Sequence, residues 1–352
     1  MSNVLLAPGM VSVRFALDSV YNNLASLYMV TLANTFLELH NWVRQTAAGL
    51  SAEQMHARRL LSGILYSAFE PDEDWPSFPA YLDHLAGQDP NRMRDRFLKH
   101  MFPGLGEQCV HRNQLMDLET FIARIDRSEL DEEIGHGLFA EAHALLSDPP
   151  TMRDVIVSHL RTMWHTALAP EWKRNAAFLT QIVDAFQRHD YSGQTAYDAI
   201  RSVTGRDAHG CWQRVLAPAK TLIFIPSPHI GPYLLHYAYG PVVRIVFGAH
   251  LPQEEEHAPT ELTQADLLVQ LRALADDTRL RILELLFEEG KLSAQEIIAR
   301  LNLGKSSASR HLSQLSAAGY LVEHQTGKTK CYALNPEHFQ ETLRFLERYA
   351  QA

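Results

Sequence analysis

The sequence predicts a mainly α protein built from two domains. The chain has 352 residues, which is more than one typical domain of roughly 100–200 residues. Apolar residues recur with the period of a helix over most of the chain up to residue 220. A run of glutamates and prolines at residues 251–263 then breaks the composition, and a second set of helical patterns follows it. We therefore divide the chain into residues 1–250, an acidic linker at 251–263, and residues 264–352.

Helical patterns follow one another through the first domain. Asp18 or Ser19 caps a long helix, and Ser51 with Gln54 forms the capping box of the next. Further helices are expected near residues 91–101, 107–126, 129–146, 150–167, 171–188 and 193–203. Prolines 149, 150 and 170 are expected to mark helix boundaries, because proline interrupts the interior of a helix.

Three short runs near the end of the first domain have the composition of strands. Residues 221–225, 233–239 and 242–247 are rich in β-branched and aromatic side chains and are separated by Pro and Gly. We expect a small antiparallel sheet, a meander of two or three strands, that closes this domain. Residues 10–16 alternate in polarity and predict one more short strand.

The last 89 residues predict a defined order of short elements. Helices are expected at residues 267–275, 277–290, 293–301, 305–318 and from 336 onward. The turn Asn302-Leu303-Gly304 joins the third to the fourth helix, which is the arrangement of a helix-turn-helix. Residues 320–325 and 328–334 flank Thr326-Gly327 and predict a β-hairpin, which would form a wing beside it.

The second helix of the helix-turn-helix has two different faces. Ala308, Leu312 and Leu315 share one face and are expected in the core. Short serine side chains on the other side allow close approach to a DNA major groove, and an arginine can donate two hydrogen bonds to a guanine edge. Lysines near the hairpin tip are placed to hold the phosphate backbone. The candidate DNA-binding residues are Lys305, Ser306, Ser309, Arg310, His311, Gln314, Lys328 and Lys330.

The charge distribution agrees with a local nucleic-acid interface. The whole chain carries 32 basic and 41 acidic residues, a net charge of −9, which excludes a surface that is basic all over. From Arg300 to Lys330, however, five basic residues stand against Glu323 alone. The predicted partner is double-stranded DNA. The competing interpretation is a helix and a hairpin that merely face solvent.

Three motifs in this region resemble ArsR-type transcriptional regulators. They are Leu274-Ala-Asp-Asp-Thr-Arg279, Ser309-Arg-His-Leu312 and Gly327-Lys-Thr-Lys-Cys-Tyr332, and the resemblance covers roughly residues 265–350. It implies a winged helix-turn-helix repressor that binds a pseudo-palindromic operator as a homodimer, with helices 265–275 and 337–350 packing across the two-fold axis. It also implies that Lys305, Ser306, Ser309 and Arg310 read bases.

The chain departs from the metal sensors of that family. Residues 293–298, where such sensors carry paired cysteines, contain none, and the last helix offers only His338. Cys331 falls on a predicted wing strand, where it is expected to pack as a small apolar residue. We therefore expect no metal and no cofactor.

The first domain leaves three functions open: binding of a small-molecule effector, dimerisation alone, or catalysis. Its many aromatic residues are able to form an apolar pocket, although each one singly fits an ordinary core. The sequence contains no GxGxxG after a strand, no phosphate-binding GxxxxGK loop, no GxSxG and no HExxH, so we do not expect an enzyme. We expect a sensor or dimerisation domain. The alternative is a ligand-binding or catalytic protein whose winged helix mediates protein contacts.

Cysteine content and hydropathy predict a cytoplasmic protein. Cys109, Cys211 and Cys331 form neither a disulfide framework nor a CxxC motif, which fits a reducing compartment. Polar residues at 19–37 and prolines at 221–243 interrupt the two longest stretches without charge, so neither is expected to span a membrane. The N-terminal residues lack the basic start of a signal peptide.

Overall fold

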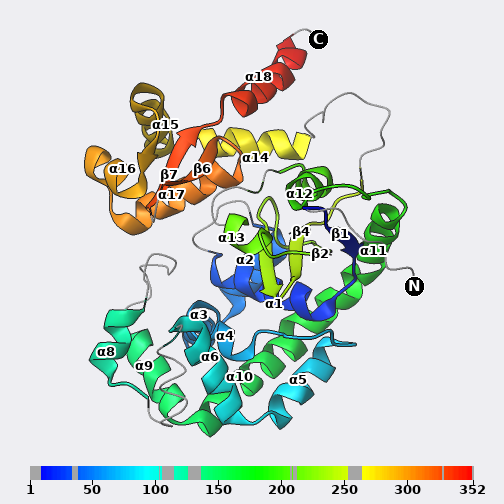
Figure 1. Ribbon diagram of the computed structural model, residues 1–352, viewed down its shortest axis with the longest axis vertical. Helices are drawn as coiled ribbons and strands as arrows, with labels where there is room; N and C mark the ends of the chain where they lie inside the picture. Colours follow the sequence, from blue (N-terminus) through cyan, green and yellow to red (C-terminus); the bar gives the residue numbers. More distant parts are fainter. Residues whose placement is uncertain are drawn as a thin grey trace. The chain divides into compact units, whose positions relative to one another are not determined.

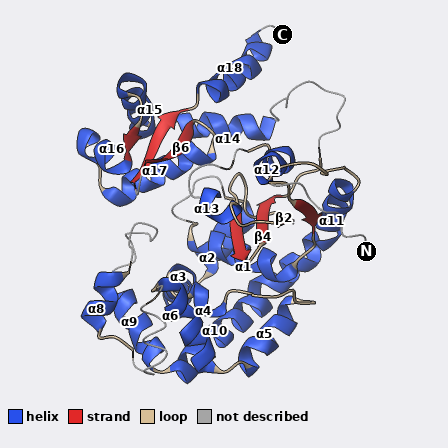
Figure 2. Ribbon diagram, viewed as in Figure 1, coloured by secondary structure: helices blue, strands red, loops and turns tan. Residues whose placement is uncertain are grey.

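The computed structural model describes residues 9–33, 39–102, 104, 115–125, 136–206, 208, 212–252, 264–326 and 329–350. Helices dominate these residues and two small sheets accompany them, which confirms a mainly α fold (Figures 1 and 2). Contacts within the chain separate it into two units. The helical unit contains residues 18–34 and 39–177, and the other unit contains residues 1–17, 35–38 and 178–352. In the described ranges, every helix is too short or too polar to cross a lipid bilayer.

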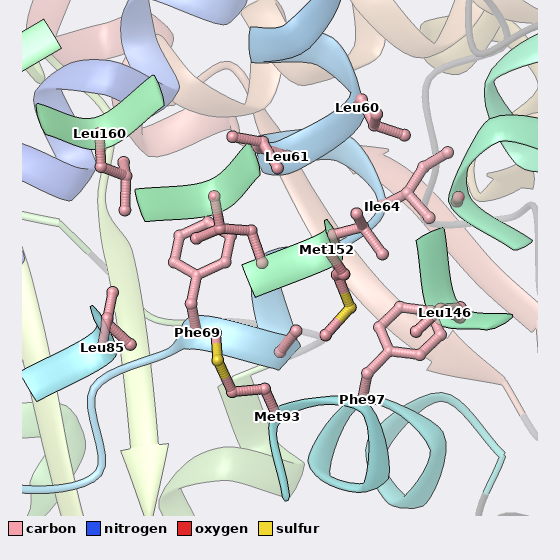
Figure 3. Packing of buried hydrophobic residues seen from close by; sticks show 14 of the residues in the cluster. Leu60, Leu61, Ile64, Phe69, Leu85, Met93, Phe97, Leu146, Met152 and Leu160 are labelled. Carbon is pink, nitrogen blue, oxygen red and sulfur yellow. The ribbon is translucent and has the colours of Figure 1, made fainter. Parts of the chain in front are cut away.

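The helical unit is built around a continuous apolar core. Its helices are α1 (Ser19–Thr31), α2 (Asn41–Gly49), α3 (Ala52–Gly63), α4 (Tyr66–Phe69), α5 (Phe78–Gly87), α6 (Pro90–Met101), α8 (Leu118–Arg124), α9 (His136–Ser147) and α10 (Pro149–Met163). Leu61 and Ile64 of α3 and Met152 and Leu160 of α10 lie in the same buried cluster (Figure 3). Burial of such side chains is the main favourable term in folding, about 1.5–3 kcal/mol for each one.

Local sequence signals set where several of these helices begin. The carboxylate of Asp18 accepts hydrogen bonds from the amides of Val20 and Tyr21, so Asp18 is the N-cap of α1. The capping box of Ser51 and Gln54 begins α3 as predicted. The helix boundary expected at Pro170 lies at Ala169, where α11 (Ala169–Gln187) begins, but the chain stays helical across it. A π-helical segment (Trp164–Leu168) joins α10 to α11, and a wider turn of this kind accommodates a residue that lacks a backbone N–H.

The sheet formed with the end of the first domain is not the predicted antiparallel meander. Its strands are β1 (Ser12–Phe15), β2 (Thr221–Ser227), β3 (Leu235–Tyr239) and β4 (Val242–Gly248), in the order β1-β2-β4-β3. β1 and β4 both run parallel to β2, and only the edge strand β3 is antiparallel, to β4. All residues of the helical unit lie in the chain between β1 and β2. They form part of the long crossover that neighbouring parallel strands require.

The last part of the chain folds as the predicted winged helix-turn-helix. Its elements are α14 (Gln264–Leu274), α15 (Asp277–Glu289), β5 (Leu292–Ser293), α16 (Ala294–Leu301), α17 (Lys305–Ala317), β6 (Leu321–Thr326), β7 (Thr329–Leu334) and α18 (Pro336–Ala350) (Figure 1). β6 and β7 form the wing hairpin, and β5 adds a two-residue strand to β7 that the sequence pattern did not predict. Ser293 and Glu296 form the expected capping box of α16.

His159 of α10 gives the folding stability a pH dependence. Burial, together with the nearby charge of Arg58, lowers the pKa of His159 from 6.5 to about 3. The folded state then binds fewer protons than the unfolded state, so this stability is complete above pH 6.5 and falls as the pH drops toward 3. Between pH 7 and pH 5 the single residue should cost about 2 kcal/mol of unfolding free energy. Urea titrations of wild type and His159→Gln at pH 7 and pH 5 measure this difference in unfolding free energy. If both proteins lose the same unfolding free energy at pH 5, the prediction is contradicted.

Candidate nucleic-acid interface

The core face of α17 fixes the orientation of the helix. Ala308, Leu312 and Leu315 are 0% exposed, as the sequence predicts. Leu312 and Leu315 pack in one cluster with Ile282 of α15 and Ile297 of α16. Because these contacts come from both preceding helices, they hold α17 firmly, and the side of α17 opposite to them is presented outward.

The turn before α17 depends on Asn302 rather than on the glycine. Asn302 ends α16 in the left-handed conformation, with φ of 51°, which asparagine tolerates better than most residues. Gly304 has φ of −69° and is the N-cap of α17. The turn therefore lies where the sequence predicts it, but its conformational requirement falls on a different residue.

The outward side of α17 carries free basic and hydroxyl groups. Lys305, Ser309, Arg310 and Ser313 are exposed. Among the residues that the structure describes, neither Lys305 nor Arg310 has a hydrogen-bond or ion-pair partner. Ser306 lies in the first turn of α17, and its side chain is outside what the structure describes. A guanidinium without an internal partner retains all its donors for a ligand.

Two of the predicted contact residues point inward, so their expected placement at the interface is wrong. His311 and Gln314 are each 8% exposed. Nδ1 of His311 lies 3.6 Å from a carboxylate oxygen of Asp276, and burial lowers the pKa of this imidazole despite that carboxylate. The side-chain oxygen of Gln314 accepts a hydrogen bond from Arg279. Both residues thus belong to the support of α17 rather than to its outward side.

Arg279 supports α17, and the helical pattern of the sequence does not single it out. Its side chain is 3% exposed and donates to the carbonyl of Ala273 at 2.5 Å, the carbonyl of Arg272 at 2.8 Å and the side chain of Gln314. The two carbonyls lie in the last turn of α14, and the negative end of a helix attracts a cation. Arg279 thereby links α14, α15 and α17. Its place in a family motif was the available signal, since its exposure cannot be read from helical periodicity.

The wing offers less free charge than its sequence predicts. Lys330 lies 2.8 Å from a carboxylate oxygen of Glu323 and 5.4 Å from the ring centre of Tyr332. Arg300, on α16, forms an ion pair with Glu289. Lys328 is outside the described residues. The free cations of this region in the described ranges are therefore those of α17, and Lys330 would have to exchange an exposed ion pair for a phosphate.

The two helices expected to form a dimer interface contact each other within one chain. The hydroxyl of Thr342 on α18 lies 2.8 Å from the side-chain oxygen of Gln270 on α14, and both residues are buried. The hydroxyl of Tyr320 lies 3.3 Å from that of Thr342. Leu343, the next residue of α18, is 52% exposed. α14 and α18 thus form one layer that keeps an apolar side chain at the surface.

Comparison with known proteins gives similarities on this part of the chain. The family model described as "Bacterial regulatory protein, arsR family" matches residues 276–322. The chain is 41% identical over 69 residues to the arsenic resistance transcriptional regulator ArsR1 of Pseudomonas putida, covering 20% of this chain and 54% of that protein. It is 33% identical over 75 residues to the transcriptional repressor SdpR of Bacillus subtilis, covering 21% of this chain and 82% of that protein. A solved ArsR-like transcriptional regulator from Rhodococcus sp. RHA1 is 30% identical, with coverages of 25% and 81% and a TM-score of 0.24.

These similarities bear on a limited share of the chain. Each covers a quarter of this chain or less, and the chain spans little more than half the length of the two arsenic resistance regulators of Pseudomonas putida that it matches. The matched residues 276–322 contain α15, α16 and α17, together with the start of the wing. The resemblance inferred from the sequence motifs is therefore confirmed for the helix-turn-helix.

Proposed function

The chain belongs to the ArsR family of bacterial regulatory proteins, and from that premise we propose that it regulates transcription by binding double-stranded operator DNA. One observation carries the proposal: α17 presents exposed Lys305, Ser309 and Arg310 opposite a fully buried face. A helix with these side chains fits a major groove, where hydroxyls permit close approach and arginine reads guanine. Lys328 and Lys330 on the wing would then contact flanking phosphates.

We further propose that the chain acts as a homodimer. A single recognition helix reads one half-site, and two copies related by a two-fold axis read a pseudo-palindrome. The layer of α14 and α18, with its exposed Leu343, supports a dimer contact on that side. One of the matched relatives is named a repressor, and we propose repression as the direction of control.

We assign regulation to residues 1–250, DNA binding to residues 264–352, and a linker to residues 251–263. A helical unit with its own apolar core is large enough to hold a small-molecule effector, which would change DNA affinity. No catalytic step enters this proposal.

Salt dependence tests the proposal. The full chain should bind DNA from upstream of its own coding sequence, and the affinity should fall about a thousandfold between roughly 50 and 200 mM salt, as expected for about six phosphate contacts by a dimer. Fluorescence anisotropy at a series of salt concentrations measures the slope, with scrambled DNA of equal length as the control. No complex even at low salt would favour the alternative, a winged helix that mediates protein contacts.

A further inference from the structure

Arg58, on α3 of the helical unit, is a buried cation without an acidic partner. Its side chain is among the fully buried ones, and the residue is 1% exposed. Nε lies 3.5 Å from the hydroxyl of Thr31, and Nη2 donates to the hydroxyl of Ser62. Across the described residues, Nη1 has no hydrogen-bond partner and no carboxylate pairs with this guanidinium. A buried charge of this kind is costly unless an anion accompanies it.

Arg279 shows how this chain satisfies a buried guanidinium when the role is structural. Three of its nitrogen atoms donate to two backbone carbonyls and to Gln314, so no side-chain nitrogen is left over. Arg58 differs, because its Nε and Nη2 reach only two hydroxyl groups and its buried Nη1 has no acceptor among the described residues. A missing acceptor at a buried arginine points to a group that the described residues do not supply.

His159 places a second unpaired nitrogen beside Arg58. It lies on α10, which packs against α3, and burial together with the charge of Arg58 lowers its pKa to about 3. Its Nε2 is buried and has no hydrogen-bond partner in the part of the chain that the structure describes. The imidazole is therefore neutral at physiological pH and is able to donate one N–H to an acceptor.

We propose that Arg58 and His159 form the anion-binding end of a site for a small organic monocarboxylate in the helical unit. One carboxylate oxygen accepts from Nη1 of Arg58, and the other accepts from Nε2 of His159. The hydroxyls of Thr31 and Ser62 hold the guanidinium in place from its other side.

The charge and the surroundings favour a monocarboxylate over a phosphate. One fixed positive charge and one neutral imidazole balance a single negative charge, whereas a phosphate dianion needs more donors. Leu61, one turn after Arg58, and Leu160, beside His159, lie in the apolar core and would contact the body of the ligand (Figure 3). Thr31 and Ser62 are partly exposed, so one edge of the site reaches the surface.

Carboxylate binding by this site does not depend on DNA. Its use as an effector site, which would couple the ligand to operator affinity, rests on the proposed function. A direct measurement of carboxylate binding to the full chain without DNA therefore separates the two proposals. If no carboxylate binds, the salt-dependent test of DNA binding keeps its meaning. If DNA does not bind, the carboxylate measurement keeps its meaning.

Thermal melting and calorimetry of the full chain test the site with benzoate, phenylacetate, hexanoate and octanoate as probes. We expect at least one carboxylate to raise the Tm saturably, while its uncharged amide, chloride and inorganic phosphate do not. Arg58→Met should weaken binding of that carboxylate at least about tenfold, since a charge-assisted hydrogen bond is lost. Without ligand, Arg58→Met should melt at or above the wild-type Tm, because an unpaired buried charge is removed.

Matched variants keep the test decisive. Arg59→Met, at the adjacent residue, should bind the carboxylate as wild type does. Arg58→Lys and His159→Gln should each bind it more weakly than wild type, and they decide the question if Arg58→Met does not fold. The proposal is overturned if none of the four carboxylates binds wild type, or if the affinity survives these three substitutions. Binding that Arg59→Met abolishes as completely would overturn it as well.

Discussion

Replacing Arg310 with alanine should weaken operator binding about 10- to 100-fold and remove the preference for one base pair. Arg310 lies on the outward side of α17 and has no hydrogen-bond or ion-pair partner among the described residues, so its removal breaks nothing inside the domain. An arginine that donates two hydrogen bonds to a guanine contributes about 1–3 kcal/mol of discrimination. The melting temperature should remain that of wild type. Titrations on the operator and on single-base variants of it measure both affinity and preference.

Arg281→Ala is the matched control for this prediction. Arg281 is exposed on α15, a helix outside the proposed recognition surface. Its replacement by alanine removes the same charge from the same domain as Arg310→Ala does. Its effect on affinity should stay within about threefold, the range of a screened charge. If Arg310→Ala lowers affinity equally for all DNA sequences, Arg310 contacts phosphate and not bases. If it changes nothing, the proposed orientation of α17 is wrong.

The buried face of α17 was predictable because periodicity reports burial directly. Ala308, Leu312 and Leu315 repeat at i, i+4 and i+7, and all three are fully buried. Gln314 lies at the flank of the same projection, where periodicity gives no answer. Its burial depends on Arg279, 35 residues earlier, which reaches it from another helix. Tertiary contacts decide whether a polar side chain at such a position is buried, and the pattern of a single helix does not contain them.

The direction of strands in the first sheet was mispredicted for a related reason. Three strand-like runs close together in sequence favour a meander, yet β2 and β4 are parallel and β3 lies at the edge. The run Val242–Gly248 has five consecutive buried residues, which is the pattern of a strand covered on both faces and typical of parallel sheets. The partner strand β1 lies more than 200 residues away in the chain, beyond the reach of local patterns.

Arg58 shows the limit of sequence reasoning for the site in the helical unit. It stands beside Arg59 in an ordinary amphipathic helix, and nothing in that pattern separates the two. Only the packing of α3 against α1 and α10 makes Arg58 buried and brings His159 close to it. The information is carried by residues 27 and 101 positions away, so it becomes visible only in three dimensions.

Replacing Arg279 with methionine should destabilise the winged helix-turn-helix by about 3–5 kcal/mol, because three buried hydrogen bonds from a charged donor are lost together. Methionine keeps most of the apolar stem, so the loss reports the missing hydrogen bonds to Ala273, Arg272 and Gln314. Since α14, α15 and α17 would lose their common link, the Arg279→Met protein should lose operator binding as it approaches its own lowered melting temperature. Urea unfolding followed by circular dichroism measures the loss.

Two companion variants identify the cause. Arg272→Met, at an exposed neighbouring arginine whose backbone carbonyl is the acceptor, should change the unfolding free energy by less than about 0.5 kcal/mol. Gln314→Leu should cost about 1–3 kcal/mol, because it leaves one donor of Arg279 unpaired. The double variant should lose less unfolding free energy than the sum of the losses of the two single variants, since both substitutions remove the same hydrogen bond. Strict additivity, or a Gln314→Leu protein with wild-type stability and altered base preference, would return Gln314 to the DNA surface and remove Arg279 from its support.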